Sequence, residues 1–192
     1  MKSIVIAITG ASGAIYGVRL LEILQEKNVT VHLTASPAAE ITLRLETGST
    51  IKRLAKLAAK YYDVNDLAAP IASGSFQVQG MVIVPCSTRT LAAVANGISD
   101  NLITRAADVC LKEKRPLVIV PRETPLNQIQ LRNMLTLAQA GTIILPASPA
   151  FYHKPTDINQ LVDHVVGKIL DAIGIEHSLF KRWQGLELAL KS

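Results

Sequence analysis

Hydroxyl groups gather in the run PCSTRT at residues 85–90, directly after a predicted strand. Ser87, Thr88 and Thr90 offer three hydroxyls at the start of a predicted helix, where unpaired backbone N–H groups favour anions. Arg89 adds a guanidinium to the same run. Hydroxyls and amides of this kind suit a phosphate or a polyol, so the segment predicts a binding loop for an anionic small molecule.

A glycine-rich run, TGASGAIYG at residues 9–17, follows the first predicted strand. Glycines let backbone N–H groups approach a ligand closely at the start of a helix. The spacing G-x-x-G-x-x-x-G differs from the G-x-G-x-x-G of dinucleotide-binding turns. A turn of this kind serves either a ligand or chain reversal alone, so the run needs support from elsewhere.

The end of the second predicted strand argues against NAD as the ligand. A dinucleotide site has Asp or Glu there to hold the ribose hydroxyls. Here the strand is followed by Ser36, with Pro37 at a predicted first helical position. Ser36 either caps this helix, or it offers its hydroxyl and the helix N–H groups to a phosphate.

Charged and phenolic side chains follow the last two predicted strands. Arg122 and Glu123 stand between two prolines, where a guanidinium can clamp a phosphate and a carboxylate can move a proton. An exposed ion pair is the alternative. Tyr152 and His153 lie in a proline-bracketed loop, and Lys168 follows in the next predicted helix. Lys168 either reaches an anion from this helix or is a solvated surface lysine, which is the commoner role of a lone lysine.

Strands and helices that alternate along the chain must position these residues. Apolar, β-branched runs predict strands at 4–8, 29–34, 81–84, 117–120 and 142–145. Segments with helical periodicity lie at 14–26, 37–46, 50–60, 88–95, 101–114, 126–140 and 156–173. Ser87, Ser99 and Thr156 are predicted N-caps. The alternation is typical of an α/β fold, a doubly wound, mainly parallel sheet with helices on both faces. Ligands of such sheets bind outside the carboxyl ends of the strands.

The composition indicates one compact domain of 192 residues, with a tail at 178–192 whose place the pattern leaves open. No apolar run reaches the roughly 18–20 residues of a membrane span, and the N-terminus lacks the features of a secretion signal. Cys86 and Cys110 stand apart, which predicts two reduced thiols in a cytoplasmic setting. No His or Asp is placed to activate Cys86, so we expect a core thiol there rather than a nucleophile.

The formal charge of +5 is compatible with nucleic acid or with a small anion. The basic residues are scattered, and four Tyr, three Phe and one Trp form no stacking cluster, so we expect no nucleic-acid binding. The four histidines show no metal-ligand spacing, so we expect no structural metal. Arg105, Asp108 and Lys112 share one predicted helix face, as either a surface charge ladder or a ligand site.

Together, four segments resemble the UbiX-type flavin prenyltransferases, within the flavin-binding decarboxylase-like superfamily. They are TGASGAIYG at 9–17, PCSTRT at 85–90, NLITRAADVCLKEKRPLVIVPRETP at 101–125 and PASPAFYHKP at 146–155. The resemblance extends from about residue 3 to residue 185. Four separate motifs in the same order make it specific.

The resemblance implies an FMN-binding enzyme that consumes reduced FMN as a substrate. Members transfer a dimethylallyl group from dimethylallyl monophosphate to flavin N5 and close a fourth ring at C6. The prenylated FMN serves a UbiD-type decarboxylase, in many bacteria on the ubiquinone route. Members commonly assemble as dodecamers, so the resemblance also implies a homo-oligomer.

The resemblance further implies roles for individual residues. The FMN contacts would be Gly10, Ala11, Ser12, Ser36, Ser87, Thr88, Arg89, Thr90 and Arg122. The prenyl phosphate would be held by Tyr152, Lys168, Arg122 and Lys112. Glu46 and Glu123 resemble acidic residues near the reacting atoms, and which of them handles the proton stays open. Ser12 resembles a hydroxyl beside N5. Arg89 stands where many members have glycine, so its contact would come through the backbone.

The absence of a D-D-x-x-D motif fits metal-independent prenyl transfer. Without Mg²⁺, the charge of the leaving group must be met by side-chain donors, which Arg122, Tyr152 and Lys168 supply. Two alternatives stay open. One is an FMN-dependent decarboxylase of the same superfamily, whose peptidyl-cysteine members carry an Asn-containing motif in place of PCSTRT. The other is a flavin carrier module without chemistry of its own.

Overall fold

One six-stranded parallel sheet organises the computed structural model, which describes residues 3–185. The strand order is β3-β2-β1-β4-β5-β6, and every pair of neighbours is parallel, which confirms the predicted fold class. The strands are β1 (Ser3–Ile8), β2 (Thr30–Ala35), β3 (Lys60–Tyr62), β4 (Met81–Cys86), β5 (Leu117–Pro121) and β6 (Ile143–Ile144). The helices are α1 (Ala14–Glu26), α2 (Pro37–Thr47), α3 (Ile51–Leu54), α4 (Thr88–Ala95), α5 (Leu102–Lys112), α6 (Gln128–Gln139) and α7 (Ile158–Ala172).

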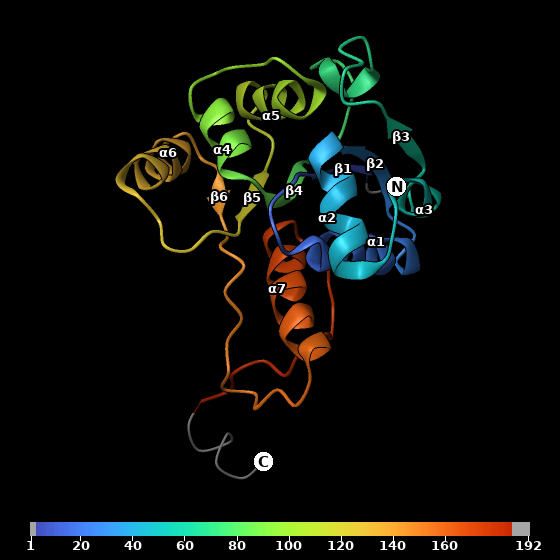
Figure 1. The fold of residues 1–192 in the computed structure, drawn as a ribbon. Helices are drawn as coiled ribbons and strands as arrows, with labels where there is room; N and C mark the ends of the chain where they lie inside the picture. Colours follow the sequence, from blue (N-terminus) through green and yellow to red (C-terminus); the bar gives the residue numbers. More distant parts are fainter. Residues whose placement is uncertain (1–2, 186–192) are drawn as a thin grey trace.

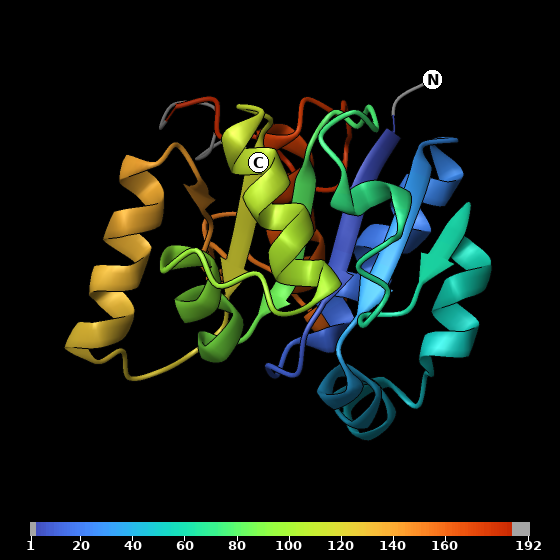
Figure 2. The ribbon, with the colours of Figure 1, turned by 90° about the horizontal axis from the view of Figure 1, so that it is seen from above.

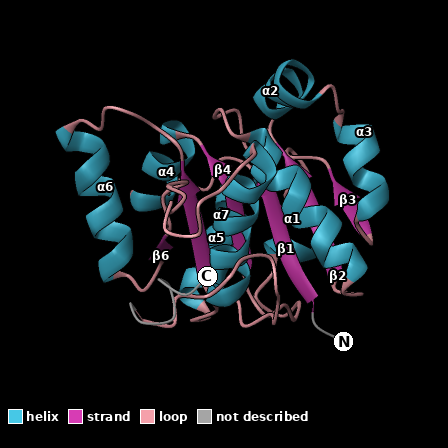
Figure 3. Ribbon diagram, turned by 90° about the horizontal axis from the view of Figure 1, so that it is seen from below, coloured by secondary structure: helices cyan, strands magenta, loops and turns pink. Residues whose placement is uncertain are grey.

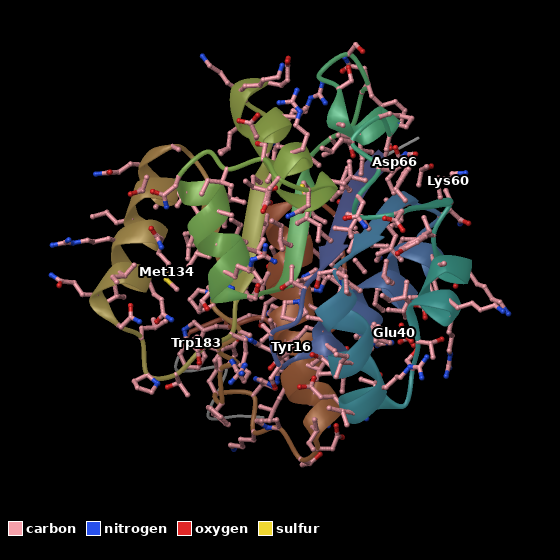
Figure 4. The ribbon with its side chains drawn as sticks, turned by 45° about the horizontal axis from the view of Figure 1, so that its top comes forward. Tyr16, Glu40, Lys60, Asp66, Met134 and Trp183 are labelled. Carbon is pink, nitrogen blue, oxygen red and sulfur yellow. The ribbon has the colours of Figure 1, made fainter. Side chains whose placement is uncertain are left out.

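Helices cover both faces of the sheet (Figures 1 and 2). α1 and α7 pack against each other on one face, whereas α4 and α5 lie on the other. Figure 3, seen from below, shows α1 lying over β1 and β2. α6 packs against α4 near β6, and α2 lies toward the β3 side, so Met134 and Glu40 mark opposite sides of the molecule in Figure 4. The molecule is therefore a three-layer α/β structure.

Alternation along the strands divides the core in two. Ile4, Ile6 and Ile8 pack with α1 and α7, whereas Val5 and Ala7 pack with α4 and α5. All five side chains are buried. Because both faces of the sheet are covered, its strands are apolar throughout rather than at alternate positions. These two cores hold the strand ends, and the loops that follow them, in fixed positions.

The segment predicted as a helix at 50–60 is shorter in the structure. Thr50 caps α3, a single turn continues as the 3-10 helix Ala55–Leu57, and the chain then enters β3. β3 pairs with His32–Thr34 of β2, so a tertiary contact overrides the local helical pattern. The caps predicted at Ser99 and Thr156 are also wrong, because side-chain oxygens at positions 101 and 157 accept the first N–H groups of α5 and α7.

The order in which the strands are added to the sheet reverses at β1. From this strand the chain first adds β2 and β3 on one side, and it then returns to add β4, β5 and β6 on the other side. In open α/β sheets, a crevice forms at such a switch point, outside the carboxyl ends of the strands. The loops after β1, β2, β4 and β5 therefore define where a ligand would bind.

Candidate functional site

Thr9 ties the carboxyl ends of β1 and β4 together. Its hydroxyl donates to the carbonyl of Pro85 at 2.7 Å and accepts the backbone N–H of Ser87 at 2.7 Å. Thr9 is buried, so both bonds form away from bulk water, and no atom of the bridge is left unsatisfied. The bridge fixes the spacing between the glycine-rich turn and the PCSTRT loop, the two segments that flank the crevice.

Two serines begin helices at the same edge of the sheet. Ser36 Oγ accepts the N–H of Ala39 at 3.3 Å at the start of α2. Ser87 Oγ accepts the N–H of Thr90 at 3.3 Å at the start of α4, and it donates to the Thr90 hydroxyl at 3.1 Å. Helix starts carry partial positive charge, so both are suited to an anion. The predicted N-cap role of Ser87 is confirmed.

The turn between β1 and α1 lies close against α2. A Cβ added to Gly10 would overlap the side chain of Ala38 and would lie 3.3 Å from the carbonyl carbon of Ala38. Gly13 has a φ of 100°, a left-handed conformation that other residues rarely adopt. Arg122 crosses from the end of β5 and donates through Nε to the carbonyl of Ser12 at 3.1 Å. Glycine is therefore required twice in this turn for steric reasons alone.

A carboxylate of the protein itself occupies the start of α1. Glu46, at the end of α2, accepts the N–H of Gly13 at 2.9 Å and that of Ala14 at 2.8 Å. This carboxylate satisfies donors that the sequence pattern offered to a ligand. Of the helices that follow β1, β2 and β4, those that begin after Ser36 and Ser87 remain for a ligand phosphate.

Tyr16 stands beside Arg122 and was not singled out by sequence reasoning. A Cβ at Gly13 would lie 3.0 Å from the Tyr16 ring and 3.6 Å from Arg122 Cγ, so all three residues are neighbours. Burial raises the pKa of the Tyr16 phenol, and the nearby Arg122 charge partly opposes that rise. Its sequence signals were its place in the run TGASGAIYG and in the first turn of α1. Tyr16 is a neutral phenol at the crevice.

Two other predicted residues, Arg89 and Glu123, have exposed side chains at this edge of the sheet. Arg89 has a side chain that is 86% exposed, and its guanidinium lies 3.5 Å from the carboxylate of Asp100. Any ligand contact from position 89 would thus come from its backbone. Glu123 is exposed and accepts the N–H of Thr124 at 3.0 Å.

A second group of predicted residues lines a pocket of about 380 Å³ at α7. Tyr152 and Lys168 both line it, as the family resemblance implied. His164, Phe180, Arg182 and Trp183 complete the lining, and none of these four was predicted to belong to it. Phe180, Arg182 and Trp183 come from the segment after α7, which folds back along that helix. The rings of Trp183 (labelled in Figure 4) and Tyr152 meet edge to face, with their centroids 5.7 Å apart.

Asp171 holds this returning segment to α7. It accepts two hydrogen bonds from Arg182, at 2.7 and 3.0 Å, and lies 3.2 Å from His177 Nε2. Lys168 Nζ lies 4.0 Å from the same carboxylate. The hydrogen bonds from Arg182 are the main reason that the pKa of Asp171 is lowered. The spacing of three residues between Lys168 and Asp171 was the one available signal for this ion pair.

Lys112 lies far from the other predicted phosphate contacts within one chain. It ends α5, just before β5 begins, whereas Arg122 follows the opposite end of β5. Its amine pairs with Glu113. Arg105, on the same helix, donates to the carbonyl of Ala72 and pairs with Asp108 at 2.9 Å, as expected of a surface charge ladder. The structure therefore does not bring Lys112 to Tyr152 and Lys168.

Both cysteines are core thiols. Burial raises the pKa of Cys110 to about 11, and it raises that of Cys86 further. Neither thiol is therefore ionised at neutral pH. Residues 3–185 also contain no cluster of three or more His, Cys, Asp or Glu side chains suited to a metal ion. No helix within this range is long and apolar enough to cross a membrane.

The residues at the crevice fit FMN. Two capped helix starts can take a phosphate, and Thr88 and Thr90 add hydroxyls for a polyol chain. Arg122 and the phenol of Tyr16 can donate to ring carbonyls. The end of β2 carries Ser36 where a dinucleotide site needs a carboxylate, so the donor set fits a mononucleotide better than NAD.

Comparisons with known proteins agree with this arrangement. The family model described as Flavoprotein matches residues 1–170. The flavin prenyltransferase UbiX of Escherichia coli (strain K12) is 48% identical over 188 residues, which cover 96% of this chain and 100% of that protein. The chain belongs to the UbiX-type flavin prenyltransferases.

Solved structures place this flavin prenyltransferase in the same fold. AnUbiX (PadA1), in complex with FMN and dimethylallyl pyrophosphate, superposes with a TM-score of 0.95 at 48% identity, covering 96% of this chain and 98% of that one. The dodecameric FMN-dependent UbiX-like decarboxylase from Escherichia coli O157:H7 superposes with a TM-score of 0.93 at 47% identity, covering 95% and 100%.

Proposed function

We propose that the chain transfers the dimethylallyl group of dimethylallyl monophosphate to reduced FMN and so makes prenylated FMN. Reduced FMN supplies the electron-rich N5 and C6 atoms that the group alkylates. The C1–O bond of the allyl phosphate breaks as the C1–N5 bond forms, N5 loses its proton and phosphate leaves. Ring closure joins C3 to C6, with one proton taken up at C2 and one lost from C6.

The observation that carries this proposal is the meeting of Tyr152 and Lys168 in one pocket. The two residues come from different segments, the loop after β6 and the middle of α7. A phenol and an ammonium together suit a phosphate oxygen that gains charge as its bond to carbon breaks. Lys168 and Arg182 bring two positive charges against the one negative charge of Asp171, so the pocket retains a net positive charge for the anion.

The FMN would lie along the switch point between β1 and β4. Ser36 and Ser87 would present their hydroxyls and the N–H groups of α2 and α4 to the phosphate and ribityl chain. The backbone of residues 10–12 would approach the flavin ring, as would Arg122. Arg122 would also face the second substrate, because it lies beside the crevice and its side chain is oriented by the carbonyl of Ser12.

The two acidic residues differ in how freely they can move a proton. Glu46 is engaged by the N–H groups of Gly13 and Ala14. Glu123 is exposed and accepts an N–H only from its neighbour Thr124 among the described residues. Glu123 is therefore the more available proton acceptor, and Glu46 would hold the turn that carries Ser12.

The setting of the protein follows from the same proposal. We infer a single domain in the cytoplasm, where the two buried, unpaired thiols would stay reduced. The product would pass to a UbiD-type decarboxylase. A homo-oligomer is expected because the UbiX-like relative from Escherichia coli O157:H7 is dodecameric. A contact between Lys112 and the prenyl phosphate would then have to come from a neighbouring copy.

The test is the mass of the flavin after anaerobic incubation with reduced FMN and dimethylallyl monophosphate, with EDTA present. We expect the mass of one added dimethylallyl group. Lys168→Ala and Tyr152→Phe should lose product while retaining FMN, and exposed Lys27→Ala should match the wild type. Because AnUbiX was solved with dimethylallyl pyrophosphate, the pyrophosphate is run in parallel. Strict Mg²⁺ dependence would show that the leaving group has been misassigned.

A decarboxylase of the same superfamily is the alternative. The crevice offers donors for FMN and one pocket for a small phosphate. Carbon dioxide release is measured from the protein, flavin and an aromatic acid, with and without a UbiD-type partner. Release only with the partner supports prenyl transfer, whereas catalytic release without it would overturn the proposal. If the protein bound flavin but the mass of the flavin did not change, the chain would be a flavin carrier module.

A further inference from the structure

His164 lies on the same face of α7 as Lys168, one helical turn before it. It is 7% exposed, and its ring lines the pocket that Tyr152 and Lys168 share. The ring meets that of Tyr152 edge to face, stacks parallel on that of His153 and is tilted against that of Phe180. The distances between ring centroids are 6.1, 5.4 and 4.7 Å, respectively. These three aromatic neighbours fix the plane of the imidazole.

One hydrogen bond sets the tautomer of this imidazole. The backbone N–H of Ala150 lies 3.3 Å from Nδ1 of His164. A backbone N–H can only donate, so Nδ1 must carry its lone pair and the ring proton must be on Nε2. Within residues 3–185, Nε2 has no hydrogen-bond partner. Because His164 lines the pocket, this N–H is a donor available to a ligand there.

The environment of His164 keeps the ring neutral. Burial lowers its pKa, and the neighbouring His153 and Lys168 lower it further. Tyr152, His153 and Arg182 face the ring from other segments, and Lys168 faces it from α7 itself. Protonation would also place an N–H at Nδ1 against the N–H of Ala150. A neutral ring with one directed donor is the stable state.

We propose that His164 is a further phosphate-binding residue, which donates from Nε2 to the phosphate held by Tyr152 and Lys168. This inference rests on the proposed function for the identity of the phosphate ester. The donor is uncharged, so it fixes the orientation of the anion without adding to the positive charge of the pocket. Within this pocket, the imidazole then joins the phenol of Tyr152 and the ammonium of Lys168 in holding the leaving group.

Two substitutions separate the donor from the structural bond. In Asn, the side-chain oxygen occupies the place of Nδ1, so His164→Asn keeps an acceptor for Ala150 but removes the Nε2 donor. In Gln, the amide nitrogen reaches the place of Nε2, so His164→Gln keeps a donor toward the pocket but gives up the acceptor. A structural role and a phosphate-binding role therefore predict opposite rankings.

Binding of inorganic phosphate and of dimethylallyl monophosphate to the full-length, FMN-loaded protein is measured by calorimetry. His164→Asn should weaken both about tenfold or more, the effect of losing one hydrogen bond to a charged group. His164→Gln should stay within about threefold of the wild type. FMN uptake should be equal in all three proteins, which also shows that the variants fold.

The opposite ranking, or equal affinities in the wild type and His164→Asn, would overturn the inference. The proposed function fails by a different result, the absence of prenylated flavin in the wild type. Inorganic phosphate binding that depends on His164 would still identify the anion site in that case. The two claims are thus tested independently.

Discussion

The carboxylate of Glu46 accepts the backbone N–H of Ala14 at 2.8 Å, across 32 positions of sequence. This bond places a negative charge of the protein at the start of α1, where partial positive charge accumulates. It also links the end of α2 to the turn that contains Ser12. The first turn of α1 is thereby satisfied before any ligand binds.

Glu46→Gln should lower the free energy of unfolding by about 1 kcal/mol, because the amide keeps one acceptor but loses the charge at the helix start. Urea denaturation of the full chain measures this change. Glu22→Gln is the control, since the Glu22 side chain is 41% exposed and its carboxylate lies 3.7 Å from the Arg19 guanidinium. It should change stability by less than about 0.5 kcal/mol. Equal effects in the two variants would mean that the bonds to α1 contribute nothing.

Ser36→Ala should weaken FMN uptake as well as stability. Its hydroxyl caps α2, and loss of such a cap costs about 1 kcal/mol. Thr50→Ala is a matched control, because Thr50 caps α3 by accepting the N–H of Arg53 at 3.2 Å. Both variants should lose similar stability, but only Ser36→Ala should bind FMN more weakly in a fluorescence titration. Similar flavin affinities for the two would remove Ser36 from the FMN site.

Stability should decrease as the pH falls below about 6.5. Burial of His32 between Tyr62 and Phe76 lowers its pKa from the ordinary value of 6.5. As the pH is lowered, the unfolded chain therefore takes up a proton before the folded chain does. The free energy of unfolding decreases as the pH falls through this range. His32→Gln should give a flatter profile between pH 7 and pH 5. Parallel profiles would contradict this assignment.

Gly167→Ala should detach the segment after α7. An added Cβ would overlap the Phe180 ring and lie 2.6 Å from Cε1 of His177. The chain has one tryptophan, Trp183, which lies in this segment and packs against Tyr152. Its fluorescence therefore reports on whether the segment stays in place. The emission should shift to longer wavelength, and phosphate binding should weaken. Asn159→Ala, in the exposed first turn of α7, should change neither, and an unshifted Gly167→Ala spectrum would refute the clash.

Sequence patterns predicted the fold well wherever local chemistry sets a boundary. The helix predicted at 14–26 matches α1, which begins directly after the left-handed Gly13. The helix predicted at 88–95 matches α4, which Ser87 caps. β3 was missed because three residues carry too short a pattern and gain their structure by pairing with β2. Its existence depends on a partner that is distant in sequence.

The candidate site divides in the same way. Residues that directly follow strands, such as Ser36, Arg122 and Tyr152, could be found because parallel strands end at one edge of the sheet. Glu46 bonding to α1 could not be predicted, because the distance from position 46 to position 14 depends on how α2 packs. Phe180 and Trp183 were missed for a related reason, since they reach the pocket through a chain reversal after α7.

The contact between Arg182 and Asp171 has a consequence for truncated forms of the protein. With both His177 and Arg182 removed, Asp171 would face Lys168, and the two charges would cancel. A chain that ended at Ile175 would thus keep its sheet, its helices and the crevice for FMN, yet present an electrically neutral wall where the second substrate binds. Proteolysis at this point would turn the molecule into a flavin holder.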